Sequence, residues 1–408
     1  METNNNRPYP LAGIRVIDMS TVIAGPVTAR IFADLGADVI KIESVGGDVI
    51  RTINMNSPTA PEGQPFVAMT NSNKKFVSLN LKSAEGKQIL MEMLEKADVF
   101  ICNIRYASLK RLGLTYEDLR SRYPKLIYAH FSGYGYAGPD AEITAYDASA
   151  FWARNGGMID WLPEGSKYLP VASYGFGDFC SASAFFGSIM VALFVRTQSG
   201  RGTKVCGSLQ HNGIWANGSY LAASNYDFKL PWDPDQYDAL NFPYKCKDGE
   251  WIYLVVDGWF GDNWAKTCRV FEFEEYIGDV RFQGTNHDII RRGCMPELHR
   301  IIEKTMLHYT RAEWKKRFDE ADYTVGEVRH TKEILKDEDA WANGYIQTAE
   351  FMNGDSAVLP TIPMKFADYN VKPIGTSKSI GYDTTEVLKD MGYSMEQIRK
   401  FKENGYIR

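Results

Sequence analysis

The sequence predicts an α/β protein with a Rossmann-like large domain on a parallel sheet, plus a smaller α+β domain. With 408 residues the chain exceeds one ordinary hydrophobic core, so two domains are expected. Up to Gly135, short β-branched runs alternate with helical segments, and this alternation is typical of a mostly parallel sheet covered by helices on both faces. The alternation dissolves near residue 223, where a second unit is expected to begin.

The strands of the large domain are predicted from short apolar runs. They lie at 14–18, 38–43, 76–81, 99–102 and 126–130. Helices are predicted from Gly25-Pro26 to about Leu35, from a cap at Ser83 to Lys96, and over 115–122. Phe179 to Val195 is the longest apolar stretch, and its serines and glycine favour a buried helix of a soluble protein over a membrane span.

The domain boundaries follow from where this periodicity changes. We expect a large domain over 1–222, a linker and small domain over 223–332, and a C-terminal segment, 333–408, that returns to the large domain. The linker is 223–244, rich in Asn, Asp, Pro and aromatic residues. The small domain should hold a strand at 251–256 and helices near 263–271, 297–309 and 312–321. The tail predicts a strand around 357–366 and a helix over 384–391 that ends at Gly392.

Composition excludes several classes of function. The net charge is −5 and no run of Lys or Arg appears, which argues against nucleic-acid binding. The polar N-terminus lacks the apolar core of a signal peptide, so we expect a cytoplasmic protein without a membrane partner. The six cysteines are scattered without a CxxC pair, which fits a reducing compartment. No His/Cys cluster has metal-ligand spacing, so no metal site is expected.

The fold class invites a dinucleotide site, and the sequence disfavours it. Glu43 stands where a ribose-binding acid is found in such proteins, but the first turn, 20–26, has one glycine where three are needed. Cationic side chains follow the strands, and together they suit a phosphate-bearing handle such as that of coenzyme A, although each alone is typically a solvated charge. They are Lys74, Lys75, Lys82, Arg105, Lys110 and Arg111.

Two acids, Asp147 and Asp178, are the candidates for chemistry. Asp178 follows Gly175-Phe176-Gly177 and directly precedes the long apolar stretch, so it should lie at a helix N-terminus, where capping is the simpler role. No histidine adjoins either acid and no GxSxG occurs, which disfavours a serine or cysteine hydrolase. A carboxylate nucleophile needs no base, because an aspartate with a pKa of about 4 is already ionised at neutral pH.

Several spaced motifs, in order, resemble the family III coenzyme A transferases. They are 11–18, 24–26, 35–43, 73–75, 79–82, 132–135 with 138–139, 177–178, 197–205 and 383–388. The resemblance spans most of the chain and is weakest over 223–330. It implies that Asp178 attacks an acyl-CoA thioester, giving a mixed anhydride and then an aspartyl-CoA thioester. It also implies acyl-CoA and small carboxylic acids as substrates, no permanently bound cofactor, and a homodimer of two interlocked ring-like subunits.

The resemblance also assigns coenzyme A contacts. These fall on Ile23, Ala24, Leu79, Lys82, Asn103, Ile104 and Arg111. Ser44 and Ala145 stand where the family often has a basic residue, so phosphate and adenine contacts should differ in detail. The glycine-rich loop of some members has no clear counterpart, and 257–261 is left without a role.

The same superfamily contains 2-methylacyl-CoA racemases, whose catalytic histidine would stand where this chain has Tyr146. A tyrosine has an ordinary pKa of about 10 and is a poor base, which favours a transferase. Asp147, Gly177 and Tyr146 are expected to support the site, with backbone N–H groups beside Gly177 stabilising negative charge. A non-catalytic coenzyme A-binding protein is the remaining alternative.

The segment 146–157 resembles the branch of the family that acts on 2-hydroxy acids such as phenyllactate and 2-hydroxyisocaproate. Four aromatic residues can line an acyl pocket or can equally belong to the core. They are Phe151, Trp152, Trp215 and Tyr220.

Overall fold

The computed structural model describes residues 7–53, 64–163, 165–226, 233, 237–255 and 260–408. The chain divides into two compact units. The large unit comprises Met1–Gly156, Val171–Ala222 and Glu338–Arg408, and the small unit comprises Gly157–Pro170 and Ala223–Asp337. Compared with the boundaries expected from sequence, the segment 157–170 groups with the small unit, which also extends to Asp337.

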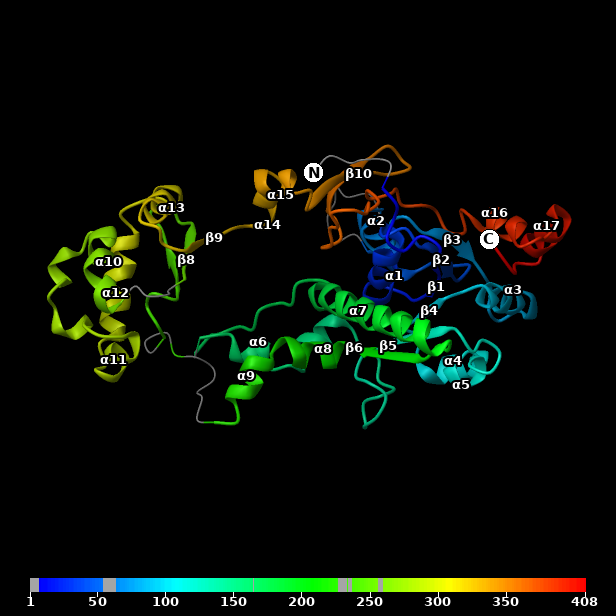
Figure 1. Cartoon of the computed structure of the whole chain (residues 1–408), viewed down its shortest axis with the longest axis horizontal. Helices are drawn as coiled ribbons and strands as arrows, with labels where there is room; N and C mark the ends of the chain where they lie inside the picture. Colours follow the sequence, from blue (N-terminus) through cyan, green and yellow to red (C-terminus); the bar gives the residue numbers. More distant parts are fainter. Residues whose placement is uncertain (1–6, 54–63, 164, 227–232, 234–236, 256–259) are drawn as a thin grey trace. The chain divides into compact units, whose positions relative to one another are not determined.

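The large unit is built on a six-stranded, all-parallel sheet in the order β3-β2-β1-β4-β5-β6 (Figure 1). Its strands are β1 (Arg15–Met19), β2 (Asp38–Glu43), β3 (Lys75–Ser78), β4 (Val99–Cys102), β5 (Ile127–Ser132) and β6 (Lys204–Ser208). The predicted parallel sheet is therefore confirmed. β6 was missed, because Lys204-Val-Cys-Gly-Ser has a glycine and too few apolar residues to be recognised as a strand.

Helices cover both faces of this sheet, as predicted. Successive side chains of a strand point to opposite faces. In β4, Val99 and Ile101 pack into the core that includes α1 (Ala24–Asp34) and α7 (Phe176–Ser199), while Phe100 and Cys102 pack into the core that includes α3 (Ala84–Glu95). α1 and α7 also pack on each other.

The remaining elements of the large unit are short. Its other helices are α2 (Gln64–Asn71), α4 (Tyr106–Leu112), α5 (Tyr116–Leu119), α8 (Leu209–Ala216), α9 (Gly218–Ala223), α15 (Glu338–Ala342), α16 (Thr384–Asp390) and α17 (Met395–Glu403), with a 3-10 turn at Val49–Thr52 and a π-helical segment at Asp147–Trp152. β10 (Ile346–Glu350) and β11 (Ser356–Pro360) form an antiparallel hairpin. The C-terminal segment packs beside β3, where the Phe76 N–H donates to Asp383 Oδ2 at 2.7 Å.

The small unit contains an antiparallel sheet in the order β7-β8-β9, formed by Pro243–Lys245, Trp251–Leu254 and Val325–Val328. Its helices are α6 (Gly157–Asp160), α10 (Trp264–Phe271), α11 (Asn286–Arg291), α12 (Met295–Met306), α13 (Arg311–Glu320) and α14 (Thr331–Ile334), with 3-10 turns at Gly261–Asn263, Glu274–Tyr276 and Val280–Phe282. The interpretation of 223–244 as a linker is wrong in its last part, because Ala239, Leu240 and Tyr244 are buried in the core of this unit.

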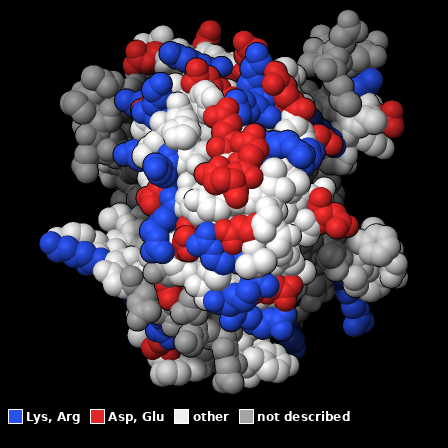
Figure 2. All heavy atoms as spheres, turned by 90° about the vertical axis from the view of Figure 1, so that its left-hand side faces the viewer, with Lys and Arg blue, Asp and Glu red and all other residues white. Residues whose placement is uncertain are grey.

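Two surface properties bear on partners. By length and composition alone, α7 could cross a membrane, but the core helix of a soluble protein meets the same criteria. Figure 2 shows acidic and basic side chains interspersed on the face that it draws, so this face carries no continuous basic stripe.

Candidate active site

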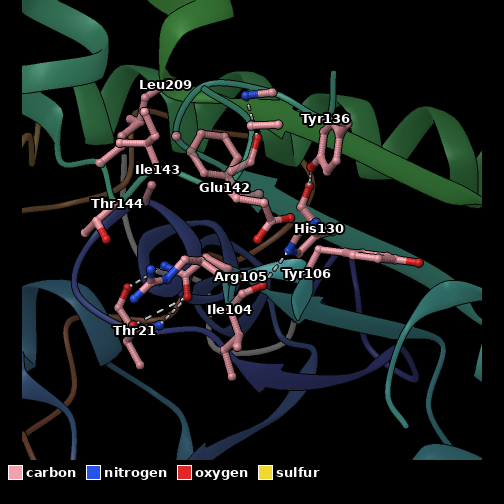
Figure 3. A pocket seen from close by; sticks show the side chains of 18 of the residues that line it. Thr21, Ile104, Arg105, Tyr106, His130, Tyr136, Glu142, Ile143, Thr144 and Leu209 are labelled. Atoms are coloured by element: carbon pink, nitrogen blue, oxygen red, sulfur yellow. Dashed lines mark hydrogen bonds between the residues drawn. The ribbon is translucent and has the colours of Figure 1, made fainter. Parts of the chain in front are cut away.

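A cavity of about 620 Å³ opens at the carboxyl ends of the strands in the large unit. The strand order reverses between β1 and β4, and crevices at such a reversal are where open α/β sheets bind ligands. Figure 3 shows Thr21, Ile104 and Arg105, from the loops after β1 and β4, on one side of the cavity, with Ile143, Thr144 and Leu209 on another. The fold therefore brings distant segments to one site.

Asn103 fastens the two loops to each other. Its side-chain oxygen accepts from the Thr21 N–H at 2.9 Å, and its amide nitrogen donates to the Thr21 carbonyl at 2.8 Å. This pair of bonds continues the contact of β1 with β4 beyond the ends of the two strands.

Asp178 lies in the first turn of α7, as predicted, and lines the cavity with 8% of its surface exposed. The N-cap is Gly175, which has φ of +77° and makes no side-chain cap. The backbone N–H of Ala24, at the N-terminus of α1, instead faces the Asp178 carboxylate and favours its ionised form. Two helix N-termini thus stabilise negative charge at this carboxylate.

Asp147 begins the π-helical segment and lines the same cavity, 7% exposed. A Cβ atom on Gly177 would lie 2.2 Å from Asp147 Oδ1 and 2.3 Å from Phe151 Cγ. Only glycine leaves room for Asp147 to approach the first turn of α7, which explains the Gly177-Asp178 pair in structural terms.

The ionisation of Asp178 differs from the expectation. Burial, with a further contribution from the charge of Asp147, raises the pKa of Asp178 to about 7, and the Ala24 N–H acts against this rise. The predicted pKa of about 4 is wrong, because sequence alone does not show that the carboxylate is buried beside a second acid. Burial likewise raises the pKa of Asp147, opposed by the N–H groups of Gly177 and Gly175 and by Trp152.

The predicted coenzyme A contacts divide into two groups. Ile23, Ala24, Asn103 and Ile104 line the cavity, as does Tyr146, which is 62% exposed. Leu79, Lys82 and Arg111 are not part of its lining. The Leu79 side chain is 1% exposed in the core, Lys82 is exposed after β3, and Arg111 donates to Ser108 Oγ at the rim.

The prediction that six cationic side chains bind ligand phosphates is wrong for two of them, Lys74 and Lys75. Lys74 is fully buried, and its Nζ lies 2.8 Å from Asp18 Oδ2, so no ligand phosphate reaches it. Lys75 stands at the start of β3, whereas the cavity lies at the carboxyl ends of the parallel strands, and it pairs with Asp38. Of the six, Arg105 lines the cavity.

The aromatic residues considered for an acyl pocket do not line this cavity. Phe151 belongs to the core, and Trp215 is 81% exposed. Of the segment 257–261, positions 257–259 lie outside the described residues, and Gly261 begins a 3-10 turn of the small unit.

Several lining residues were missed from the sequence. His130, whose pKa burial lowers, contacts the Ile104 carbonyl at 2.8 Å, and its own carbonyl accepts from the Tyr136 hydroxyl. Lys204 and Leu209 also line the cavity, and both were missed along with β6. The position of His130 at the end of a predicted strand was the one signal in the sequence that could have identified it as a lining residue.

Below the loop after β1 lies a fully buried group of four charged residues, which we name the buried charge network: Asp18, Lys41, Asp48 and Lys74. The Lys41 ammonium lies 3.0 Å from Asp48 and 4.0 Å from Asp18. Directly above, Val22 has φ of +69°, a left-handed conformation that is rare for a β-branched residue and costs about 1–3 kcal/mol.

Comparison with known proteins identifies the family to which the chain belongs. A family model described as CoA-transferase family III matches residues 11–384. The chain is 33% identical to the (R)-2-hydroxy-4-methylpentanoate CoA-transferase of Clostridioides difficile, over 98% of this chain and 99% of that one. It is also 33% identical to the cinnamoyl-CoA:phenyllactate CoA-transferase of Clostridium sporogenes, over 99% and 98% of the two chains.

The fold is similar to that of a solved structure, a CAIB/BAIF family protein from Brucella suis. The TM-score is 0.80 at 23% identity, covering 94% of this chain and all of that one (100%). At this identity the likeness concerns the fold alone.

Proposed function

Because the chain belongs to CoA-transferase family III and is a transferase, we propose that it moves coenzyme A from an acyl-CoA to a 2-hydroxy acid, with Asp178 as the covalent nucleophile. The observation that carries this proposal is the buried Asp178 carboxylate, which lines the cavity at the point where α1 and α7 both begin. Coenzyme A thioesters enter as substrates, and no cofactor is bound permanently.

The first half-reaction forms the enzyme thioester. An ionised Asp178 oxygen attacks the thioester carbonyl carbon, the carbon–sulfur bond breaks, and coenzyme A leaves as a thiolate, giving a mixed anhydride. The thiolate then attacks the Asp178 carbonyl carbon, and the donor acid leaves as a carboxylate. The Ala24 N–H faces the oxygens on which negative charge develops in these steps.

The second half-reaction runs the same steps in reverse order. The acceptor carboxylate attacks the aspartyl thioester, releasing the thiolate and forming a second anhydride. The thiolate attacks the acceptor acyl carbon, the Asp178–acyl bond breaks, and the Asp178 carboxylate is restored. No proton is transferred to or from carbon, so no strong base is required.

The acceptor class is supported by two relatives whose names include 2-hydroxy-4-methylpentanoate and phenyllactate. Both acids have an apolar side chain. Ile143 and Leu209 give the cavity an apolar side where such a chain can be placed.

Transfer assays with matched acids test this function. We expect new thioesters, identified by liquid chromatography and mass spectrometry, when cinnamoyl-CoA is mixed with phenyllactate or with 2-hydroxy-4-methylpentanoate. The matched acids without the hydroxyl, 3-phenylpropanoate and 4-methylpentanoate, should be poorer by at least about tenfold in kcat/KM, because a site that bonds the hydroxyl leaves polar groups unpaired with them.

The alternatives give different outcomes in the same assay. Deuterium exchange at the α-carbon of a 2-methylacyl-CoA, without any acceptor acid, would support the racemase. Binding of acyl-CoA with no transfer to any carboxylate would support a non-catalytic coenzyme A-binding protein.

We also propose that the protein is a homodimer of interlocked subunits. In support, α7 exposes a row of apolar side chains, with Val191 63%, Phe194 63% and Val195 46% exposed. A contiguous apolar row of this kind is typical of an interface.

Sedimentation equilibrium tests this proposal, and we expect it to give twice the mass of one chain. Val191→Glu should weaken association, whereas Val280→Glu, at a 77% exposed valine of the small unit, should not. A wild-type monomer would contradict this proposal.

A cytoplasmic location remains part of the proposal. It is supported by the six scattered cysteines, none of which forms a disulfide. Cell fractionation tests it, and recovery in the membrane fraction would contradict it.

A further inference from the structure

We propose that the buried charge network positions the N-terminus of α1 beside the nucleophile: it holds Val22 in its left-handed conformation and so keeps Ala24, the first residue of α1, next to Asp178 in the lining of the cavity. This inference rests on the proposed function, in which Asp178 reacts. It assigns a role to Asp48, Lys41, Asp18 and Lys74, none of which lines the cavity.

The network forms hydrogen bonds with the backbone of the loop after β1 and the start of α1, on both sides of Ala24. Asp18 Oδ1 accepts from the Ser20 N–H at 3.0 Å, Lys41 Nζ donates to the Ser20 carbonyl, Asp48 Oδ1 accepts from the Val22 N–H at 3.2 Å, and Lys74 Nζ donates to the Pro26 carbonyl at 2.7 Å. All four charged side chains are at most 1% exposed, so water does not compete for these bonds.

The strained residue is the one that Asp48 holds. Val22 has φ of +69°, and nothing about a valine favours that conformation. The Val22 N–H is bonded by Asp48, whose other oxygen lies 3.0 Å from the Lys41 ammonium. An unfavourable conformation that persists must be held by its surroundings, and here the holder is a buried carboxylate.

The strained turn determines where α1 begins. α1 starts at Ala24, two residues after Val22, and its N-cap, Ile23, provides no side-chain acceptor. The first N–H groups of a helix need an outside partner. The Ala24 N–H faces the Asp178 carboxylate, which lines the same cavity and whose pKa this N–H lowers. A different conformation at Val22 would turn this N–H away from the nucleophile.

The charged and titratable groups around Asp178 are few. Asp147 faces it from the π-helical segment, Tyr174 from the loop before α7, and Tyr146 stands beside Tyr174. Cys180, on α7 itself, interacts with Asp147. Among the described residues, no cation contributes to the ionisation of Asp178. Of the groups that shift the pKa of Asp178, the Ala24 N–H is the one that favours the ionised form.

Asp48→Asn tests the inference because asparagine has one side-chain oxygen where aspartate has two. Asp48 Oδ1 accepts from Val22 and Ile50 N–H groups, while Oδ2 accepts from Lys41. In the variant the buried ammonium attracts the single oxygen, and the NH2 group then faces the Val22 N–H. The hold on Val22 is lost without a change of size.

We expect three results. The pKa of Asp178, followed by difference infrared spectroscopy against Asp178→Asn, should rise by about one unit, because the ionised form loses a donor. The acid limb of kcat/KM should move up in pH with it. The kcat should fall about 10²-fold, the usual cost of losing one donor to a developing oxyanion.

A second substitution separates positioning from a general loss of structure. Glycine takes positive φ without a steric penalty, so Val22→Gly in the Asp48→Asn background should recover at least about tenfold of the lost kcat and lower the pKa of Asp178 again. The matched control is Asp34→Asn, which removes a buried charge paired with Arg30 in the same unit. It should lower stability and leave the acid limb in place.

The outcomes distinguish the inference from the function on which it rests. A wild-type protein that transfers coenzyme A to no carboxylate overturns the proposed function. A normal wild type with an unmoved or lowered Asp178 pKa in Asp48→Asn overturns the inference alone, because removing a nearby negative charge by itself lowers that pKa. Equal effects of Asp48→Asn and Asp34→Asn on the acid limb also overturn it.

Discussion

Asp178→Asn is expected to abolish coenzyme A transfer, with kcat lowered on the order of 10⁴-fold or more, the scale seen when a covalent nucleophile is removed. The amide has the shape of the carboxylate but cannot form the anhydride. Binding of acyl-CoA, measured by calorimetry, should persist, since Ile23, Asn103 and Ile104 are unchanged. Near-normal turnover of this variant, with deamidation excluded, would rule out Asp178 as the nucleophile.

Trapping should locate the intermediate. Wild-type protein mixed with acyl-CoA should gain mass, and hydroxylamine or borohydride treatment followed by peptide mapping should place the modification on Asp178. Cys180 is the neighbouring residue that could be acylated instead, although burial raises the pKa of its thiol. Cys180→Ser is therefore the control, and it should retain the adduct.

The Asp178→Asn variant should be more stable than the wild type at high pH. The pKa of Asp178 is raised from 3.8 to about 7 in the folded protein, so the folded state binds the proton more tightly than the unfolded state. The stability that this provides is present below pH 4 and is lost as pH rises to about 7. Asparagine stays neutral, so its advantage, at most a few kcal/mol, should grow between about pH 4 and 7 and level off above pH 7 in urea unfolding.

Gly177→Ala is expected to lower kcat about 10²-fold or more, because a displacement of about 1 Å at a reacting group costs that much. The added Cβ would lie 2.2 Å from Asp147 Oδ1 and 2.3 Å from Phe151 Cγ, so the first turn of α7 or the π-helical segment must move. Either movement shifts Asp178 relative to Ala24. Steady-state kinetics and the melting temperature measure the two consequences.

Gly218→Ala is the matched control for this substitution. Gly218 begins α9, and a Cβ atom there meets nothing within 4 Å. It should keep full activity and gain slightly in stability, since alanine favours a helix over glycine. If Gly177→Ala also keeps full activity, the close approach of Asp147 to α7 is not needed for catalysis.

Much of the fold could be predicted because its signals are local. Alternating runs such as 38–43 identify the strands, and Ser83, which accepts from the Gly86 N–H at 3.0 Å, caps α3 as its residue type suggests. The place of Asp178 at the start of α7 was predictable for the same reason. An acid directly before a long apolar run is a signal of a helix start.

What sequence could not supply depends on contacts between distant residues. The raised pKa of Asp178 requires knowing that its carboxylate is buried and that Asp147, distant in the sequence, lies beside it. Lys74 reads as an ordinary surface cation, and only the folded chain shows it paired with Asp18. The bonds between Asn103 and Thr21, which join the loops after β1 and β4, have no signature in either loop.

The buried charge network couples assembly of the site to folding of the whole N-terminal region. Its members come from β1, β2, the segment after β2 and the turn before β3, so its complete set of ion pairs exists only after all these elements have docked. In a partly folded chain the bond from the Val22 N–H to Asp48 is therefore not expected to hold the loop after β1 in place. Partly folded copies are therefore expected to be catalytically inactive.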